Sequence, residues 1–458
     1  MTLPLWTSDA IAAATGGVAS EAFVVSGVAF DSREVGPGDL FLALKGATSD
    51  GHRFATQAFV QGAAGAVVSE PVDGPHVLVR DTMAALNALG IAARARTGAK
   101  IIGVTGSAGK TGTKEALAAA LERSVPGRVH RSVKSYNNHT GVPLSLARMP
   151  ADTDYGVFEM GMSAAGELAA LTRLVRPHAA LVTTIAPAHA ANFVDEAAIA
   201  DAKGEIFEGL EPGGVGIVPE DSPHRDRLFA AAARHAATVL TFGHAETADV
   251  RAREVMPGSR GTLLSVSLPT ADLSFTLALP GAHWVSNALA VVAAVDAVGG
   301  DLAAAGLALA ELEGLKGRGA RTRVPRDGGE LLLIDESYNA NPASMAATIA
   351  LLGQEQAARR IVVLGGMREL GTGSDAYHAM LADPLLAAAV DFALLVGDEM
   401  TPLARALEGR IDFAHVADAV AALAALRDRL KAGDAVLVKG SNAIGLARVV
   451  DAVASGKI

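Results

Sequence analysis

The sequence predicts an α/β protein of three domains: a small α/β N-terminal domain, a central domain with a mostly parallel sheet, and a C-terminal Rossmann-like domain. Three observations predict this organisation. The chain has 458 residues, more than one compact core usually contains. Short apolar runs alternate with helical stretches, which is typical of parallel sheets covered by helices. A Gly- and Arg-rich link, GLKGRGARTRV, separates two such series. We therefore expect domains over residues 1–97, 98–316 and 317–458.

The elements expected in each domain follow from these patterns. The N-terminal domain contains short β-like runs, FVVSGVAF, DLFLAL, AGAVVS and HVLV, separated by Gly and Pro residues. The central domain alternates the apolar strands IIGVTG, YGVFEM, AALVTTI, GVGIVP and TVLTFG with helices, including EAAIADAKGEIFEGL. Residues 248–280 change to period-two stretches, which predict an antiparallel meander, and two helices follow it. The C-terminal domain repeats the βα pattern from ELLLIDESY to DAVLVKG.

Composition excludes several classes of protein. Half of the residues are hydrophobic and 19% are charged, so the chain folds. A net charge of -10 argues against general nucleic-acid binding, which depends on clustered Lys and Arg. The absence of cysteine excludes disulfides and thiolate chemistry. The N-terminus lacks the basic region of a signal peptide, and no apolar run approaches the ~20 residues that a membrane span needs. We therefore expect a cytoplasmic protein without a membrane span.

A phosphate-binding loop is the clearest motif. The strand IIGV, the loop TGSAGKTGT and the helix KEALAAALER form the strand, Gly-rich loop and helix order that makes such a motif credible. Lys110 would reach the β- and γ-phosphates of ATP, and the Thr111 hydroxyl would bind Mg²⁺. Val104 occupies the first glycine position of the full motif, so the loop is a shorter variant. The expected contact residues are Thr105, Gly106, Ser107, Ala108, Gly109, Lys110, Thr111 and Gly112. A plain glycine-rich turn is the alternative. The central domain is thus predicted to be a P-loop ATPase domain.

Three further residues of the central domain invite a chemical interpretation. Glu159 ends the strand YGVFEM, which places its carboxylate beside the phosphate loop, where it would bind Mg²⁺. It could also be a surface carboxylate that closes a strand. His189 follows the strand AALVTTI, but a lone histidine is usually structural and Mg²⁺ prefers oxygen ligands. Lys203 lies in a helix with Asp201 and Glu205, a pattern typical of a solvated, ion-paired lysine.

Together these motifs resemble the Mur ligase family over nearly the whole chain. The N-terminal segment DSREVGPGDLFLALKGATSDGH, the central TGSAGKT, SYNNHTGVP, FEMG, AKGEIF and LPGAHWVSNALA, and the C-terminal LGGMRELG and VKGS all match family motifs. The loop DESYNANPASM is typical of the members that add D-alanyl-D-alanine. Four positions depart from the family pattern: His139, Ala191, Trp284 and Asn442.

The resemblance implies roles for particular residues. It implies two Mg²⁺ ions and a catalytic set of Lys110, Glu159, His189 and Lys203, with Thr111, Glu159, His189 and a carbamylated Lys203 as metal ligands. It implies that Asn287 helps to hold adenine, and that Asp335 and either Arg318 or Arg321 contact ATP. The substrate residues it implies are Asp31, Ser32, Arg33, Lys45 and Gly46 for the UDP-sugar, Asn137 and Asn138 near the metal site, and Tyr338, Asn339, Asn341, Ser344 and Ser441 for the incoming dipeptide.

The reaction that the resemblance implies is ATP-dependent amide formation. The terminal carboxylate of a UDP-N-acetylmuramoyl-tripeptide would attack the γ-phosphate of ATP, and the amine of D-Ala-D-Ala would then displace phosphate from the acyl phosphate. We expect a monomer that acts on these two substrates and binds no nucleic acid. A tripeptide-forming ligase of the same family is one alternative. A nucleotide-binding regulator without enzymatic activity is another, and it would need only the phosphate loop.

Overall fold

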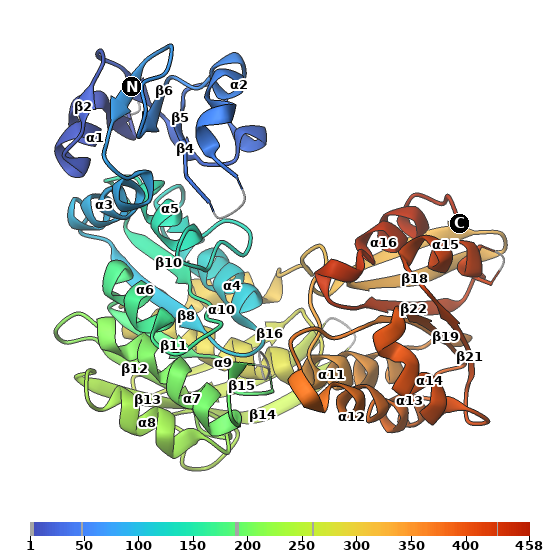
Figure 1. Cartoon of the computed structure of the whole chain (residues 1–458). Helices are drawn as coiled ribbons and strands as arrows, with labels where there is room; N and C mark the ends of the chain where they lie inside the picture. The colour runs from blue at the N-terminus through green and yellow to red at the C-terminus, as the bar shows by residue number, and fades with distance from the viewer. Residues whose placement is uncertain (1–3, 47–48, 188–191, 259–260, 428) are drawn as a thin grey trace.

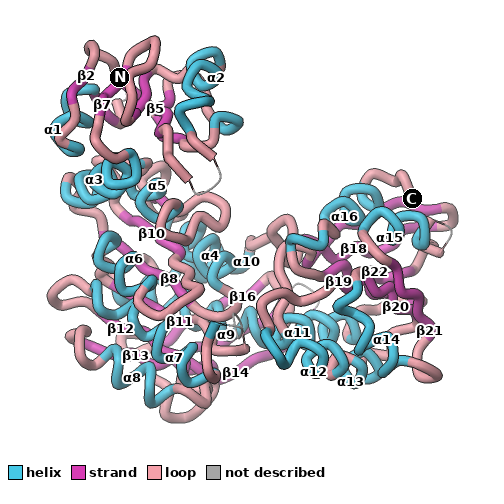
Figure 2. The backbone as a smooth tube through the Cα atoms, viewed as in Figure 1, coloured by secondary structure: helices cyan, strands magenta, loops and turns pink. Residues whose placement is uncertain are grey.

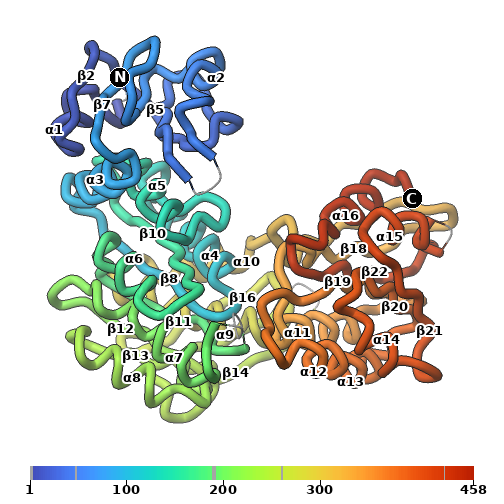
Figure 3. Tube along the Cα trace, viewed as in Figure 1, coloured from blue at the N-terminus to red at the C-terminus, as the bar shows by residue number. Residues whose placement is uncertain are grey.

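The computed structural model describes residues 4–46, 49–187, 192–258, 261–427 and 429–458, and it has three lobes (Figure 1). Each lobe contains its own sheet and is formed by one continuous stretch of the chain (Figure 3). The predicted fold class, three α/β domains with a mostly parallel central sheet, is confirmed. No helix among the described residues is long and apolar enough to cross a membrane.

The N-terminal lobe is built on a five-stranded sheet. Its order is β2 (Val18–Ala19), β7 (His76–Leu78), β6 (Gly65–Val68), β5 (Asp39–Leu42) and β4 (Gly27–Ala29). The strands β4 to β7 are parallel and β2 is antiparallel to β7. A two-stranded pair, β1 (Trp6–Thr7) and β3 (Val24–Val25), lies beside the helix α1 (Ser8–Thr15), and α2 (Ala55–Val60) and α3 (Thr82–Ala95) complete the lobe.

The central lobe has a nine-stranded sheet of order β16-β15-β14-β13-β12-β11-β8-β10-β9. Its parallel part consists of β8 (Lys100–Thr105), β9 (Val129–Arg131), β10 (Tyr155–Glu159), β11 (Ala179–Val182), β12 (Val215–Pro219) and β13 (Thr238–Gly243). The predicted meander is confirmed as β14 (Val250–Gly258), β15 (Gly261–Ser267) and β16 (Asp272–Leu277), which pair antiparallel.

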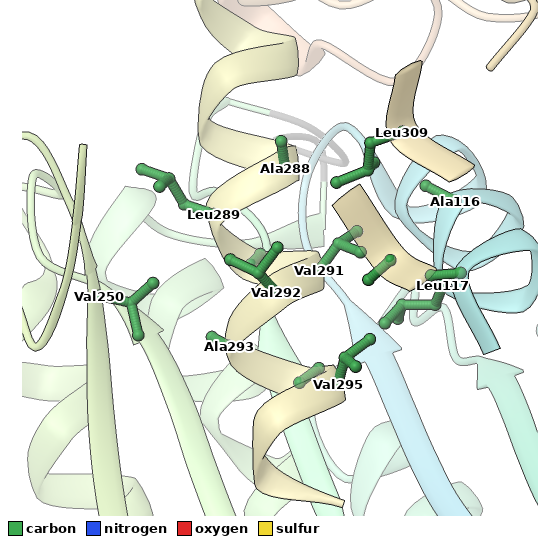
Figure 4. Packing of buried hydrophobic residues seen from close by; sticks show 14 of the residues in the cluster. Ala116, Leu117, Val250, Ala288, Leu289, Val291, Val292, Ala293, Val295 and Leu309 are labelled. Carbon is green, nitrogen blue, oxygen red and sulfur yellow. The ribbon is translucent and has the colours of Figure 1, made fainter. Parts of the chain in front are cut away.

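Helices cover both faces of this sheet. The helices α4 (Lys110–Glu122), α9 (Ala282–Ala297) and α10 (Leu302–Ala310) form one core with one face. Figure 4 shows Val291 and Val295 of α9 on the side toward Leu117 of α4, and Leu289 on the side toward Val250. The other face is covered by α5 (Gly141–Ala147), α6 (Glu167–Val175), α7 (Glu196–Gly204) and α8 (Arg225–Ala232). The helix predicted over EAAIADAKGEIFEGL ends at Gly204 and continues as a 3₁₀ turn, Glu205–Gly209.

The C-terminal lobe has a six-stranded sheet of order β17-β18-β22-β19-β20-β21. The strands are β17 (Ala320–Arg326), β18 (Gly329–Glu336), β19 (Arg359–Gly365), β20 (Phe392–Val396), β21 (Asp412–Val416) and β22 (Asp434–Lys439). The helices α11 (Pro342–Gly353), α12 (Ser374–Ala379), α13 (Ala382–Ala387) and α14 (Thr401–Leu407) cover one face, and α15 (Ala419–Leu426) and α16 (Ala447–Ala454) the other (Figure 2). The second half of the expected link is the edge strand β17, which pairs antiparallel with β18.

Buried polar contacts fasten the N-terminal lobe to the central one. The Trp6 indole donates to the Ala147 carbonyl oxygen at 2.8 Å, and the Arg96 guanidinium stacks 3.8 Å from the centre of the Trp6 ring. Arg96 also donates to the carbonyl oxygens of Leu5 and Met149. Because these donors bridge two lobes and are at least partly removed from water, they stabilise the boundary between the lobes.

Candidate active site

The phosphate loop connects the end of β8 to the start of α4 and is held by β11. Ser107 N donates to the Thr184 carbonyl oxygen at 2.8 Å, and the Thr183 hydroxyl donates to the Ala108 carbonyl oxygen at 2.6 Å. A Cβ on Gly106, where φ is +150°, would lie 1.9 Å from the Thr183 hydroxyl oxygen, so only glycine fits there. Lys110 Nζ donates to the Gly106 carbonyl oxygen at 2.7 Å, and burial lowers its pKa. The loop is thus a rigid cradle with its lysine folded over it.

Glu159 lies directly beside this loop at the carboxyl end of β10. Its side chain accepts a hydrogen bond from the Thr111 hydroxyl at 2.8 Å and another from the Asn137 amide at 2.7 Å. The residue is only 1% exposed, which excludes a surface carboxylate. A buried carboxylate next to a threonine hydroxyl supplies hard oxygen donors, the kind that Mg²⁺ prefers. These residues therefore fit a magnesium ion.

Lys203 is not the solvated lysine that its neighbours in the sequence suggest. It is 1% exposed, because α7 turns this residue into the protein. The nearby carboxylates are engaged elsewhere: Asp201 with Arg227, Glu205 with the N–H groups of Gly166 and Ala169, and Glu208 with Arg173. Burial, with a further contribution from the charge of Lys110, lowers the pKa of Lys203 well below its ordinary value. His189 lies outside the described residues.

A cleft of about 530 Å³ lies between the phosphate loop and the C-terminal lobe. Most of the sequence-predicted residues line it: Ser107, Ala108, Gly109, Lys110, Thr111, Gly112, Asn137, Asn138, Glu159, Asn287, Arg318, Tyr338, Asn339, Asn341 and Ser344. Asn287, at the start of α9, approaches the loop so closely that a Cβ on Gly109 would lie 2.8 Å from its side-chain oxygen. The phosphate site therefore opens onto a second domain.

Only one of the two candidate arginines reaches the cleft. Arg318 lies in the link between the lobes, where it donates to the Ser135 hydroxyl at 3.1 Å and stacks 4.2 Å from the centre of the Tyr338 ring. Arg321 lies on β17 and pairs with Glu355 at 2.6 Å within the C-terminal lobe. The structure therefore favours Arg318 as the residue that faces a bound nucleotide.

Two predicted residues of the C-terminal lobe lie behind the cleft wall. Asp335 is 4% exposed and accepts hydrogen bonds from Gly317 N at 2.7 Å and from the Ser337 hydroxyl at 2.6 Å. Ser441 is 5% exposed and accepts from Arg368 N at 3.0 Å. In this arrangement Asp335 holds the link that carries Arg318, and Ser441 holds the loop after β19.

The polar loop after β18 forms the opposite wall of the cleft. Asn341 caps α11 by accepting from Ser344 N at 2.8 Å, and the Ser344 hydroxyl accepts from Asn341 N at 3.1 Å. This capping box fixes the start of the helix. Tyr338 and Asn339 precede it and are exposed. Capping thus accounts for Asn341 and Ser344, while Tyr338 and Asn339 are exposed residues that line the cleft.

The candidate UDP-sugar residues lie in the N-terminal lobe and do not line this cleft. Asp31 pairs with Arg33 at 2.6 Å and accepts from its backbone N–H, and this contact lowers the pKa of Asp31. Lys45 pairs with Glu70 at 2.7 Å. The remaining two, Ser32 and Gly46, occupy a 3₁₀ turn and the turn after β5.

Among the polar residues of the cleft that sequence reasoning missed are Lys439, Glu336 and Ser135. Lys439 ends β22, is 2% exposed, donates to the Asn339 carbonyl oxygen at 2.9 Å and lies 3.5 Å from Glu336. Ser135 contacts Arg318, as described above. The sequence could have indicated Lys439 and Glu336 as site residues, since both stand at the carboxyl ends of adjacent parallel strands. No local sequence pattern indicates that Ser135 lies in the cleft.

A P-loop at the carboxyl ends of a parallel sheet, facing a second α/β domain across a cleft, defines a multidomain nucleotide-dependent enzyme. The chain matches the Mur ligase middle domain over residues 104–295, the Mur ligase glutamate ligase domain over 320–442 and the Mur ligase catalytic domain over 24–132. The chain belongs to the Mur ligase family.

Several similar proteins match more than nine tenths of the chain. The UDP-N-acetylmuramoyl-tripeptide--D-alanyl-D-alanine ligase of Escherichia coli is 36% identical over 93% of both chains. The Bacillus subtilis ligase of the same name is 33% identical over 94% of this chain and 93% of its own. A crystal structure of MurF from Acinetobacter baumannii aligns with a TM-score of 0.85 and 31% identity over 99% of this chain and 100% of that one. MurF from Thermotoga maritima in complex with ADP aligns with a TM-score of 0.76 and 25% identity, covering 94% and 97%.

Proposed function

We propose that this protein is an ATP-dependent ligase that joins D-Ala-D-Ala to the terminal carboxylate of UDP-N-acetylmuramoyl-tripeptide in peptidoglycan precursor synthesis. The observation that carries the proposal is the cleft itself, in which the phosphate loop faces the loop of residues 338–344 from the C-terminal lobe. The ligases named for this reaction match more than nine tenths of the chain.

The reaction requires neutralisation of charge, because an anionic carboxylate must approach an anionic phosphate. The carboxylate oxygen attacks the γ-phosphorus, the bond between that phosphorus and the oxygen that bridges it to the β-phosphate breaks, and ADP leaves, which gives the acyl phosphate. The amine of the dipeptide then attacks the acyl carbon, loses a proton and displaces phosphate. Lys110 and Arg318 bring positive charge to the phosphates from opposite sides of the cleft, which stabilises charge where it develops.

The magnesium ligands are proposed to be Thr111, Glu159, His189 and a carbamylated Lys203. Bound Mg²⁺ would neutralise the phosphate oxygens. The environment of Lys203 supports the carbamate, because burial lowers the pKa of this lysine and so favours the neutral amine, the form that reacts with carbon dioxide. Conversion to a carbamate would replace the lysine amine with a group that has oxygen donors, the kind that Mg²⁺ prefers.

The remaining assignments place one substrate on each lobe. Asn287 would contact adenine, the segment with Asp31 and Lys45 would hold the UDP-sugar, and the loop with Tyr338 and Asn339 would hold the dipeptide. Binding on separate lobes makes positioning a large part of catalysis. We further propose that the protein acts as a monomer in the cytoplasm, where its nucleotide substrates are found.

The test is phosphate release by the purified protein with ATP, Mg²⁺, the UDP-muramoyl-tripeptide and D-Ala-D-Ala, each also left out in turn. We expect release only when all are present, with the lysine and the diaminopimelate forms of the tripeptide compared. Release with single amino acids in place of the dipeptide would indicate a tripeptide-forming ligase. ATP hydrolysis that needs neither cosubstrate would refute the proposal.

A further inference from the structure

A second lysine of the phosphate-loop helix is buried and has no part in the reaction described above. Lys114 lies one turn after Lys110 in α4 and is 0% exposed. Its Nζ donates to the carbonyl oxygens of Ser132 at 2.8 Å and Lys134 at 2.9 Å, and it pairs with Glu115 at 2.8 Å. An ammonium group is costly to bury, so it is retained only where its partners are well placed. Lys114 therefore fixes the backbone of residues 132–134.

These residues begin a segment, residues 132–138, that we call the junction loop. Its side chains contact the N-terminal lobe: Lys134 pairs with Glu34, and the Tyr136 hydroxyl donates to Glu34 at 2.9 Å. Glu34 belongs to the 3₁₀ turn that also contains Ser32 and Arg33. The junction loop thus touches the segment proposed to hold the UDP-sugar.

The same loop contacts the C-terminal lobe and the proposed metal site. The Ser135 hydroxyl accepts from Arg318, and the Asn137 amide donates to Glu159. Gly161 N donates to the Asn137 carbonyl oxygen at 2.7 Å. One short loop therefore carries contacts to all three lobes within a span of seven residues.

The loop backbone cannot hold this shape by its own preferences. Lys134 has a φ of +51°, in the left-handed region that side-chain-bearing residues rarely adopt. The carbonyl oxygen of that strained residue is one of the two that accept from Lys114. Removal of the ammonium group would leave two carbonyl oxygens without this donor, and the backbone would move to recover hydrogen bonds.

We propose that Lys114 is a positioning residue that acts through the junction loop, setting Asn137 against Glu159 and Ser135 against Arg318. This inference rests on the proposed function, and it adds to it a residue that touches no substrate. Lys114 would couple the phosphate-loop helix to both neighbouring lobes, so that the metal site and the arginine are placed together.

The experiment compares Lys114→Met, which keeps the volume and removes the donors, with Arg94→Met as the matched control. Arg94 is a buried cation that also donates to two carbonyl oxygens, those of Val175 and Arg176, but it does not line the cleft. We expect kcat of Lys114→Met to fall on the order of 10- to 100-fold, because small displacements of catalytic groups have such effects. ADP affinity should stay within about threefold, since the phosphate-loop amides are intact. The Arg94→Met control should lose melting temperature without this loss of kcat.

Further variants distinguish a positioning role of Lys114 from a general loss of stability. In the Asn137→Ala background, Lys114→Met should cause little further loss of kcat, because both variants remove the contact between Asn137 and Glu159. Lys114→Arg, which keeps charge and donors, should recover most of kcat, and Lys114→Gln takes the place of methionine if that variant does not fold.

Three results would overturn the inference: an unchanged kcat in folded Lys114→Met, multiplicative losses with Asn137→Ala, or an equal loss of kcat in Arg94→Met. Failure of the unmutated protein to turn over would instead refute the proposed function.

Discussion

Replacement of Arg318 by methionine tests whether this residue, in the link between the lobes, is needed for activity. The side chain donates to Ser135 at 3.1 Å and stacks on Tyr338 at 4.2 Å, so it joins the junction loop to the dipeptide loop across the cleft. A hydrogen bond from a charged donor contributes roughly 1.5–3 kcal/mol and an exposed cation–π contact about 0.5–1 kcal/mol. Because the arginine is only half-buried, solvent screening reduces the combined range of about 2–4 kcal/mol to roughly 1.5–3 kcal/mol. At about 1.4 kcal/mol per factor of ten, kcat/KM should fall about 10- to 100-fold.

The assay is steady-state phosphate release with all three substrates, and the control is Arg321→Met. Arg321 stands three residues further along and pairs with Glu355 inside its own lobe. Its loss should change kcat/KM less than about twofold, because neither partner of this pair lines the cleft. The reasoning would be wrong if Arg321→Met lost more activity than Arg318→Met, or if Arg318→Met turned over like the unmutated protein.

Three more predictions follow from the same structure. Glu159→Gln, an isosteric change, should lower kcat at least ~100-fold. Its melting temperature should stay equal or rise, since a buried charge is removed. A lower melting temperature with retained kcat would contradict this prediction. Burial lowers the pKa of His130 to about 4, so the folded state keeps this side chain neutral where the unfolded chain, with a value of 6.5, is protonated. The contribution of neutral His130 to the free energy of unfolding is therefore complete above pH 6.5, and up to about 3 kcal/mol of it is lost as the pH falls toward 4. The melting temperature of His130→Gln should fall less steeply over this pH range than that of the unmutated protein. Identical pH profiles of the two proteins would refute the assignment. Arg96→Met removes the guanidinium that stacks on Trp6, and it should increase proteolysis between the first two lobes while ADP affinity is unchanged; a resistant boundary would show that the contact is dispensable.

Much of the fold could be predicted because it depends on local patterns. The apolar runs and their spacing determined the parallel strands, and the period-two stretches determined the meander of β14 to β16. The link was assigned correctly only in part, since its second half forms β17. An edge strand with arginines and a proline carries a weak apolar pattern, and pairing with β18 is what makes it a strand.

The candidate site was predictable where a residue ends a strand or occupies the phosphate loop. Glu159 is such a residue, because the carboxyl ends of parallel strands meet at one edge of a sheet. Lys203 shows the opposite case. Its neighbours Asp201 and Glu205 indicated a solvated lysine, yet the direction of α7 buries it, and a helix's orientation is not encoded in a window of ten residues.

The sequence by itself determined the phosphate loop, the three α/β units and the motifs that place the chain in its family, because each depends on residues close together in the chain. Only the tertiary structure showed that Arg318 and Ser135 line the cleft while Arg321 does not, and that Lys114 is buried against residues 132–134. Those assignments depend on contacts between segments 18 to 183 residues apart, from Lys114 to Ser132 and from Ser135 to Arg318. Such contacts arise from packing within and between lobes, and no local pattern of residue types specifies them.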